Sequence, residues 1–336
     1  MFSFSVVGGV VVREIVQSSR PAIVDAVRQA YLTHHAGRSV NPNSYFLRFP
    51  DKPEARLIAL PAYLGGEREA VGIKWIGSFP KNIERDVPRA SAVLLLNDYA
   101  TGYPFACLEA SQISAARTAA SAVLAAGELV GAKRAGKLAV IGAGIIARNI
   151  VEFFGAQDWR IERVAVFDDI PRYADALAQH CAGLGYAAAG AATLDEALGG
   201  ADVVVLATTA AAPYLTGPER FAPGQVVLNV SLRDIDPDVI AGAHNVLDDV
   251  DHCMTANTSP HLAEQKLGHR DFIDGTLAEL MLGEIALSAE RPKIFSPFGL
   301  GVLDLAVGML IYERATAAGR AVPIDGFFGE TARWGT

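Results

Sequence analysis

The sequence is poor in cysteine, and its cysteines are not paired at a spacing typical of a metal or redox site. It has three in 336 residues, Cys107, Cys181 and Cys253, and no CxxC motif. We therefore expect neither a disulfide framework nor a zinc knuckle. The N-terminus, MFSFSVVGGVVVREIV, has no basic segment before its apolar residues, so it does not match a secretory signal.

The chain also has no excess of positive charge. The chain has 29 lysines and arginines against 37 aspartates and glutamates, which is a net charge of −8. This balance disfavours a nucleic acid or an anionic membrane as the main partner. We expect no apolar run to span a membrane. A hydrophobic content of 51% is typical of a soluble globular protein, and a cytoplasmic enzyme acting on a small molecule is the resulting expectation.

The first 130 residues predict a sheet whose strands follow one another directly. Amphipathic spacing indicates a helix over 20–36. Extended segments follow at 44–49, 56–64, 70–79 and 90–98 without helices between them, which favours an antiparallel or mixed sheet. The sequence TGYP at 101–104 predicts a hairpin turn, and the alanine-rich stretch 111–129 predicts a helix.

Strands and helices alternate after Gly136. Short apolar strands are expected within 137–144, 163–169, 201–209, 225–232 and 244–249, and helices within 171–184, 193–199 and 258–270. Alternation with nearly continuous apolar strands predicts an α/β fold in which a parallel sheet is covered on both faces. A last helix over 301–320 is predicted to pack back against the first part of the chain.

A glycine motif opens the alternating region. Gly142-Ala143-Gly144-Ile145-Ile146-Ala147 fits the pattern G-x-G-x-x-A, follows a predicted strand and opens a predicted helix. In this pattern the first glycine permits the turn, and the second lets the backbone approach a pyrophosphate at a helix N-terminus. We interpret 134–303 as a doubly wound Rossmann domain that binds a dinucleotide. Residues 1–133, completed by 304–336, form a separate α+β domain in this interpretation.

Further residues are predicted to complete the nucleotide site. Asp168 ends the next strand and would bind the ribose hydroxyls, which favours NAD over NADP, although Arg172 lies nearby. Ligands of such sheets lie beyond the carboxyl ends of the strands. Thr208, Thr209 and Ser231 are therefore expected to line the nicotinamide side.

Two basic residues in the first domain are candidates for binding a substrate. Lys74 lies in an apolar strand, where burial is costly unless the charge is paired, and burial lowers the pKa of a lysine. Arg117 lies in a nearly chargeless helix, where it would suit a carboxylate. Two alternatives stay open: Lys74 reaching water from a strand edge, and Arg117 facing solvent.

These residues lie in motifs that resemble a known family. K-W-I-x-x-F-P-x-N at 74–82, L-x-x-N-D-x-x-T-G-Y-P at 94–104, A-A-R-T-A-A-S-A at 115–122 and V-I-G-A-G-x-x-A at 140–147 are similar to the ornithine cyclodeaminase/mu-crystallin family. The resemblance extends over about residues 20–327. It implies a substrate and dimerisation domain into which a Rossmann domain is inserted, and hence a homodimer.

The resemblance also implies roles for individual residues. Lys74 and Arg117 match the substrate-carboxylate binders, Thr118 follows within the same motif, and the N-terminal arginine corresponds to Arg48 or, less well, Arg56. Asp234 matches the catalytic aspartate. The family pattern Gly-x-Asp-x-Pro-Gly is replaced here by Leu-Arg-Asp-Ile-Asp-Pro at 232–237, so Asp236 is an alternative, as is Asp234 acting only as a helix N-cap.

Within the family, the amino-acid sequence of residues 44–66, 72–94 and 296–308 most resembles that of a siderophore-pathway subgroup. The members of that subgroup oxidise N-[(2S)-2-amino-2-carboxyethyl]-L-glutamate with NAD and release 2,3-diaminopropionate. The altered aspartate motif puts ornithine cyclisation in doubt. Ornithine cyclodeaminase, alanine dehydrogenase, ketimine reductase and a non-catalytic nucleotide-binding protein remain alternatives. A metal site in LDDVDHCMTA (247–256) is not expected, because no paired ligand spacing supports it.

Overall fold

The computed structural model describes residues 2–333 and contains two compact units. The first unit is Met1–Arg117 with Leu300–Thr336, and the second is Thr118–Gly299. The predicted division lay at 133/134, whereas the observed boundary falls inside helix α2 (Ser111–Val130). The beginning of α2 carries Ser114 and Arg117, whose side chains contact residues of the first unit, which explains the earlier boundary.

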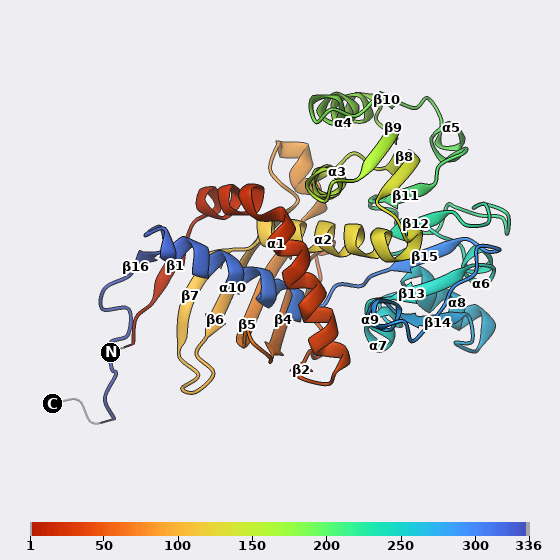
Figure 1. The fold of residues 1–336 in the computed structure, drawn as a ribbon. Helices are drawn as coiled ribbons and strands as arrows, with labels where there is room; N and C mark the ends of the chain where they lie inside the picture. Colours follow the sequence, from red (N-terminus) through yellow and green to blue (C-terminus); the bar gives the residue numbers. More distant parts are fainter. Residues whose placement is uncertain (1, 334–336) are drawn as a thin grey trace. The chain divides into compact units, whose positions relative to one another are not determined.

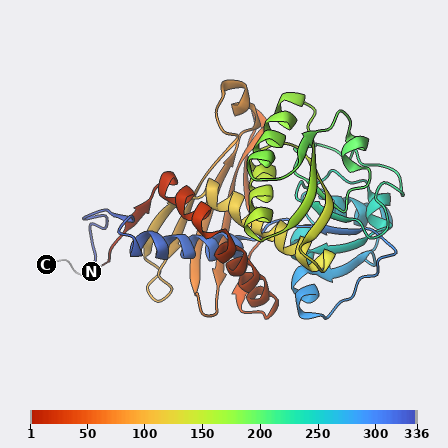
Figure 2. The same cartoon turned by 45° about the horizontal axis from the view of Figure 1, so that its top comes forward.

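The first unit is a mixed sheet with two long helices (Figures 1 and 2). The strand order is β16-β1-β7-β6-β5-β4-β2, and β3 pairs with β4. All neighbours are antiparallel except β1 and β7, which confirms the predicted mixed sheet. The elements are β1 (Ser5–Val7), α1 (Gly9–His35), β2 (Ser39–Val40), β3 (Tyr45–Phe49), β4 (Lys52–Leu64), β5 (Ala70–Ser78), the 3₁₀ helix η1 (Pro80–Arg85), β6 (Ala90–Asn97), β7 (Pro104–Glu109), α10 (Gly301–Ala317) and β16 (Val322–Pro323).

Helix α10 brings the C-terminal part of the chain onto the N-terminal sheet. It packs against α1, β4 and β5, and both views show α1 and α10 together (Figures 1 and 2). Residues 60, 62 and 64 of β4 are buried while their neighbours are half-buried, as expected for a strand with one covered face. The predicted return of the last helix to the first part of the chain is confirmed.

Helix α1 begins earlier than predicted, at Gly9 instead of residue 20. Proline favours the first turn of a helix, but Pro21 lies inside α1. Buried residues recur through the join at Val12, Ile15, Val16, Ser19 and Ile23, so packing of this stripe outweighs the missing proline N–H. The Gln17 carbonyl, which that N–H would have met, accepts a hydrogen bond from Nη1 of Arg20.

The second unit contains an eight-stranded sheet in which every pairing is parallel. The strand order is β10-β9-β8-β11-β12-β15-β13-β14, so the predicted doubly wound α/β fold is confirmed. The elements are β8 (Arg134–Ile141), α3 (Ile145–Ala156), β9 (Arg160–Phe167), α4 (Pro171–Gly183), β10 (Ala188–Gly190), α5 (Leu194–Leu198), β11 (Val203–Leu206), β12 (Val226–Asn229), α6 (Pro237–Ala241), β13 (His244–Leu247), α7 (Val250–Cys253), α8 (Ser259–Leu267), β14 (Ile273–Thr276), α9 (Leu277–Leu282) and β15 (Lys293–Ser296).

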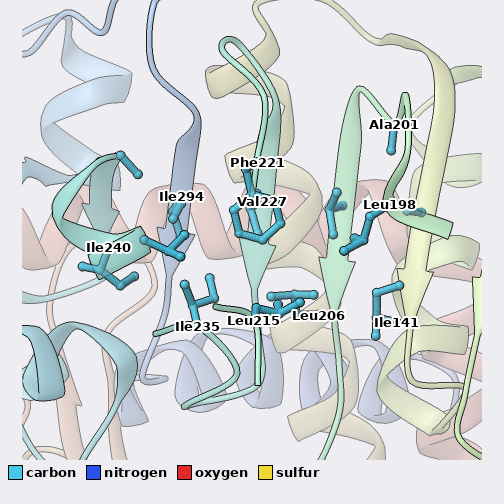
Figure 3. Close-up of a cluster of buried hydrophobic side chains, with 14 of the residues drawn as sticks. Ile141, Leu198, Ala201, Leu206, Leu215, Phe221, Val227, Ile235, Ile240 and Ile294 are labelled. Atoms are coloured by element: carbon cyan, nitrogen blue, oxygen red, sulfur yellow. The ribbon is translucent and has the colours of Figure 1, made fainter. Parts of the chain in front are cut away.

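The core of this unit lies on the central strands. Figure 3 shows Ile141, Leu206, Val227 and Ile294, one from each of four neighbouring strands, within a single buried cluster. The sequence did not predict β10, β14, α7 or α9, because elements of three to six residues are too short to show a periodicity.

Helix α2 corrects one sequence-based expectation. It is long and apolar enough to cross a membrane by length and composition, although no apolar run was expected to be. In the structure 67% of its apolar window is buried, as in the core helix of a soluble protein. Its apolar character is therefore explained by packing within the protein.

We expect Gly72→Ala to destabilise the protein and Gly127→Ala to leave it unchanged or slightly more stable. A Cβ on Gly72 would lie 2.0 Å from the backbone oxygen of Leu95, whereas one on Gly127, inside α2, would meet no atom within 4 Å. Overpacking typically costs about 1–3 kcal/mol, and alanine is favoured over glycine within a helix by about 1 kcal/mol. Urea unfolding of both variants checks this; equal midpoints would contradict it.

Candidate functional site

Lys74, Arg117 and Asp304 form a buried ionic cluster in the first unit. Lys74 lies on β5 and is 2% exposed; its Nζ donates to Asp304 Oδ2 at 2.6 Å and to Ser114 Oγ at 3.2 Å. Nε of Arg117, on α2, donates to the other oxygen of Asp304 at 3.3 Å. The two open alternatives are therefore wrong, since the side chains of Lys74 and Arg117 are only 2% and 12% exposed.

The cluster has an unusual electrostatic balance. Burial is the main cause that lowers the pKa of Lys74 to about 8; within that value Asp304 acts to raise the pKa and the Arg117 charge acts to lower it. Two cations and one carboxylate leave a single net positive charge when Lys74 is protonated. A cluster of this kind can bind one further carboxylate, and its lysine can exchange a proton near neutral pH.

Asp304 was not predicted from the sequence. It lies in the first turn of α10 and is completely buried. The sequence nevertheless contains a feature that could have identified it: Asp304 is the only charged residue in the stretch GVLDLAVG (301–308). An isolated charge in an apolar helix is the same feature that identified Arg117.

The other predicted substrate residues lie on helix α2 and on strands β3 and β4. Thr118 follows Arg117 on α2 and is half-buried. Arg48 and Arg56 lie directly opposite each other in the antiparallel β3–β4 pair. Arg48 is exposed, with its guanidinium 5.4 Å from the ring centroid of Phe46.

The predicted nucleotide motif has the expected geometry in the second unit. Gly142 directly follows β8 and has a φ of +89°, and a Cβ there would lie 2.6 Å from the oxygen of Ala207. Gly144 is the N-cap of α3, has no side-chain cap, and would meet nothing within 4 Å if it carried a Cβ. The turn thus demands glycine at the first position and leaves open space at the uncapped helix end, which fits a bound pyrophosphate.

Asp168 lies directly after β9 and holds the glycine turn. Its Oδ2 accepts a hydrogen bond from Ala143 N at 2.8 Å, and its Oδ1 accepts one from Ile170 N at 2.9 Å. Ile145 is 51% exposed and Ile146 is half-buried, both in the first turn of α3. The carboxylate stays half-buried and so retains surface for ribose hydroxyls.

Asp234 is completely buried beside the end of β11. Its Oδ2 accepts hydrogen bonds from Thr208 Oγ1 at 2.7 Å and from the Tyr214 hydroxyl at 3.0 Å, while its Oδ1 has no hydrogen-bond partner among the described residues. Burial, reinforced by the Asp234 charge, raises the pKa of Tyr214 well above its usual value. Tyr214 was not predicted from the sequence, and nothing in its local motif indicated this contact.

The remaining predicted residues differ in their surroundings. Thr209 is exposed, whereas Ser231 is buried and its Oγ has no partner among the described residues. Asp236 is the N-cap of α6 and accepts a hydrogen bond from Asp238 N at 2.9 Å. The interpretation of Asp234 as that N-cap is therefore wrong, and the two aspartates have separate environments.

The acidic stretch 247–256 forms structural contacts. Asp248 accepts hydrogen bonds from Phe298 N, Gly299 N and the Cys253 thiol. Asp249 caps α7. Within residues 2–333, no three His, Cys, Asp or Glu side chains gather as a metal site would require.

Comparison with known proteins places these features in context. The model of the ornithine cyclodeaminase/mu-crystallin family matches residues 9–319. The N-((2S)-2-amino-2-carboxyethyl)-L-glutamate dehydrogenase of Staphylococcus aureus is 33% identical over 307 residues, which cover 87% of this chain and 89% of that protein. The alanine dehydrogenase of Archaeoglobus fulgidus is 26% identical over 300 residues, covering 87% and 89%.

Solved structures share the fold over nearly the whole chain. The Thermococcus litoralis Delta(1)-pyrroline-2-carboxylate reductase, in complex with NADH and L-proline, has a TM-score of 0.86 at 22% identity and covers 96% of this chain and 100% of its own. An archaeal alanine dehydrogenase dimer with bound NAD has a TM-score of 0.85 at 24% identity, covering 97% and 100%.

The family model and the relatives extend over both units of the chain. The chain belongs to the ornithine cyclodeaminase/mu-crystallin family, in which these relatives are dehydrogenases and reductases of amino and imino acids.

Proposed function

We propose that this protein catalyses the NAD-dependent oxidative cleavage of N-[(2S)-2-amino-2-carboxyethyl]-L-glutamate. The products are L-2,3-diaminopropionate, 2-oxoglutarate and NADH. The observation that carries the proposal is the buried cluster of Lys74, Arg117 and Asp304, which suits an amino-acid carboxylate. The similarity to the Staphylococcus aureus dehydrogenase supports this substrate over others of the family.

NAD supplies the hydride acceptor in this proposal. Gly142 and Gly144 would leave room for the pyrophosphate at α3, and Asp168 would bind the ribose. Thr208, Thr209 and Ser231 follow the carboxyl ends of β11 and β12 and would line the nicotinamide side. Ile145 and Ile146, in the first turn of α3, would line the phosphate side.

The reaction balances in two stages. The glutamate-derived Cα loses a hydride to NAD and the amine nitrogen loses a proton, so that a carbon–nitrogen double bond forms. Water then adds to that carbon, and the carbon–nitrogen bond breaks. The oxygen remains in 2-oxoglutarate, and the leaving nitrogen takes a proton to become the amine of 2,3-diaminopropionate.

The chain's own groups bind the carboxylates and move these protons. Lys74 and Arg117 would hold the carboxylate next to the reacting carbon, with Thr118 beside them, and Arg48 would hold another. Lys74, whose pKa of about 8 allows proton exchange, would polarise the developing carbonyl. Asp234 would accept a proton through the Thr208 hydroxyl, because the aspartate itself is fully buried.

We also propose a cytoplasmic homodimer. Tyr45, Trp75 and Val93 occupy one row across β3, β5 and β6, on the face of the sheet opposite Lys74, and they are 70%, 39% and 39% exposed. An exposed apolar sheet face of this kind suits a second copy of the chain. The archaeal alanine dehydrogenase of the same fold is a dimer, which supports the dimeric state.

The first test is NADH formation at 340 nm with purified enzyme, NAD and N-(2-amino-2-carboxyethyl)-L-glutamate, followed by identification of the products. We expect 2,3-diaminopropionate and 2-oxoglutarate in amounts equal to NADH. L-Ornithine is measured in parallel, and we expect neither proline nor ammonia from it. Proline and ammonia from ornithine, with no NADH from the first substrate, would overturn the proposal.

We expect Gly144→Ala to keep the stability of the protein and to weaken NAD binding at least about tenfold, since a Cβ there meets no protein atom but occupies the space proposed for the pyrophosphate. Gly142→Ala should lower the melting temperature, because its Cβ would lie 2.6 Å from a backbone oxygen. Fluorescence titration with NADH and thermal unfolding separate the two effects. Unchanged NADH binding by Gly144→Ala would refute the assignment.

We expect the descending limb of the pH profile of kcat/KM to lie near pH 8 and to move to lower pH in Asp304→Asn. Lys74 binds a carboxylate in its protonated form, so activity falls as pH rises through the lysine pKa. Removal of Asp304 deletes the interaction that raises this pKa. Glu313→Gln, at an exposed acid on the same helix, is the control and should not shift the limb. An unshifted limb in Asp304→Asn would exclude Lys74 as its origin.

A further inference from the structure

Tyr214 contacts Asp234 through its backbone and through its hydroxyl. The backbone N–H groups of Tyr214 and Leu215 both donate to the Asp234 carbonyl oxygen at 3.0 Å. Leu215 and Ile235 form a parallel bridge beside this contact and lie in the buried cluster of Figure 3. These contacts join the two segments without the side chain of Tyr214. The hydrogen bond from its hydroxyl to Asp234 Oδ2 at 3.0 Å therefore needs a separate explanation.

The carboxylate of Asp234 has no surface exposed to solvent. Its side-chain partners among the described residues are two hydroxyls, those of Thr208 and Tyr214, which both donate to the same atom, Oδ2. A hydroxyl differs from a backbone N–H because it can accept one proton while it donates another. A proton can therefore reach Oδ2 through one hydroxyl and leave it through the other.

The two hydroxyls belong to residues with different surroundings. Thr208 is half-buried and lies two residues after β11, at the edge of the sheet where ligands of such folds lie. Tyr214 lies in the loop between β11 and β12, and its side chain is 37% exposed. The row from Thr208 through Asp234 to Tyr214 therefore leads from the proposed nicotinamide side to solvent.

The ionisation of Tyr214 decides how it could pass a proton. Burial, reinforced by the charge of Asp234, raises the pKa of Tyr214 well above its usual value, and the exposed Asp169 acts in the same direction. The phenolate is therefore not formed near neutral pH. Tyr214 would act as a neutral hydroxyl that takes up one proton as it gives up its own.

Oxidation of an amine by NAD leaves one proton to be removed in every turnover. In the proposed function a protonated secondary amine, NAD and water give a protonated primary amine, a keto acid, NADH and one proton. Asp234, the proposed proton acceptor, is closed off from water. A route from its carboxylate to solvent is therefore required before the next turnover.

We infer that Thr208, Asp234 and Tyr214 form a proton relay in which the Tyr214 hydroxyl is the exit to solvent. Thr208 Oγ1 gives its proton to Asp234 Oδ2 as it takes one from the substrate. Asp234 then gives a proton to the Tyr214 oxygen while Tyr214 releases its own proton to water, so all three groups return to their starting states. The relay rests on the proposed function of Asp234, but it applies equally to L-alanine, whose oxidation also releases one proton.

A single-turnover experiment separates hydride transfer from proton release. Excess enzyme and NAD are mixed with N-(2-amino-2-carboxyethyl)-L-glutamate in weakly buffered solution, and NADH absorbance is recorded together with a pH-indicator dye. In the unaltered enzyme we expect NADH and the proton to appear together. In Tyr214→Phe, NADH should appear at an unchanged rate, because Asp234 can still take up the first proton. Proton release should be at least about tenfold slower, in line with the contribution of a positioned proton-transfer group.

Matched variants assign the effect to the hydroxyl. Tyr186→Phe removes the same group from a buried tyrosine whose hydroxyl has no hydrogen-bond partner among the described residues, and it should change neither rate. Imidazole carries protons and should raise the steady-state kcat of Tyr214→Ala several-fold without affecting the unaltered enzyme. A structural role for Tyr214 would not produce this rescue. Thermal unfolding verifies that each variant is folded.

A measurement on the unaltered enzyme applies if the Tyr214 variants do not fold. The rate of proton release is followed in mixtures of H₂O and D₂O. Several protons move together in a relay, so this rate should depend on the deuterium fraction along a curve. A straight line would indicate one moving proton and would overturn the relay.

The outcomes distinguish the relay from the proposed substrate. Proton release in step with NADH in Tyr214→Phe would overturn the relay even if the substrate is oxidised, and so would an equal loss of both rates. NADH from L-alanine but not from N-(2-amino-2-carboxyethyl)-L-glutamate would overturn the substrate alone, and the relay is then measured with L-alanine. NADH from neither amino acid would overturn both, because no proton would be left to relay.

Discussion

The buried ion pair between Lys74 and Asp304 is the interaction on which the first unit depends. The two residues are 230 positions apart, and their contact joins β5 to α10. Breaking a buried pair by removing one partner leaves an uncompensated charge, which is strongly destabilising. The helix that closes the chain is thereby tied to the strand that carries the lysine. The same ion pair therefore stabilises the first unit and sets the charge around Lys74.

The same pair sets the charge that the site offers to a ligand. Without Asp304, two buried cations would repel each other, and the pKa of Lys74 would fall further. With it, Lys74 keeps a pKa of about 8 and the cluster retains one positive charge. A lysine near its pKa can bind a carboxylate and also exchange a proton. In the proposed function, Asp304 is therefore a positioning residue for both roles of Lys74.

Backbone geometry, more than charge, shapes the second unit. The carboxyl ends of the parallel strands lie along one edge of the sheet, where Gly142 follows β8 and Thr208 lies two residues after β11. The close approach of the glycine turn to Ala207 excludes a side chain at Gly142, and Asp168 holds the turn through Ala143 N. The Thr208 hydroxyl donates a hydrogen bond to Asp234, and the Tyr214 hydroxyl donates to the same oxygen of Asp234. A carboxylate therefore holds each of the two segments: Asp168 holds the glycine turn, and Asp234 holds Thr208.

Several features were readable from the sequence because they depend on local pattern. The alternation of strands and helices predicted the parallel sheet, and the glycine spacing predicted the nucleotide turn. Isolated charges in apolar segments identified Lys74 and Arg117 as candidate substrate-binding residues. Motif resemblance predicted the family, which the comparisons confirm. The early start of α1 was missed because the packing of its apolar stripe outweighs the local effect of Pro21.

What remained depended on contacts between residues far apart in the chain. No local pattern indicates that Asp304 pairs with Lys74, that Tyr214 reaches Asp234, or that Arg48 faces Arg56 across a hairpin with an irregular register. Composition and periodicity report which side chains are to be buried, but not which partners meet there. The sequence by itself determined the fold class, the nucleotide turn and the family, because these rest on short-range spacing. Only the tertiary structure decided which charges pair and which face of the sheet they share, because strand register and helix docking arise from packing of the whole unit.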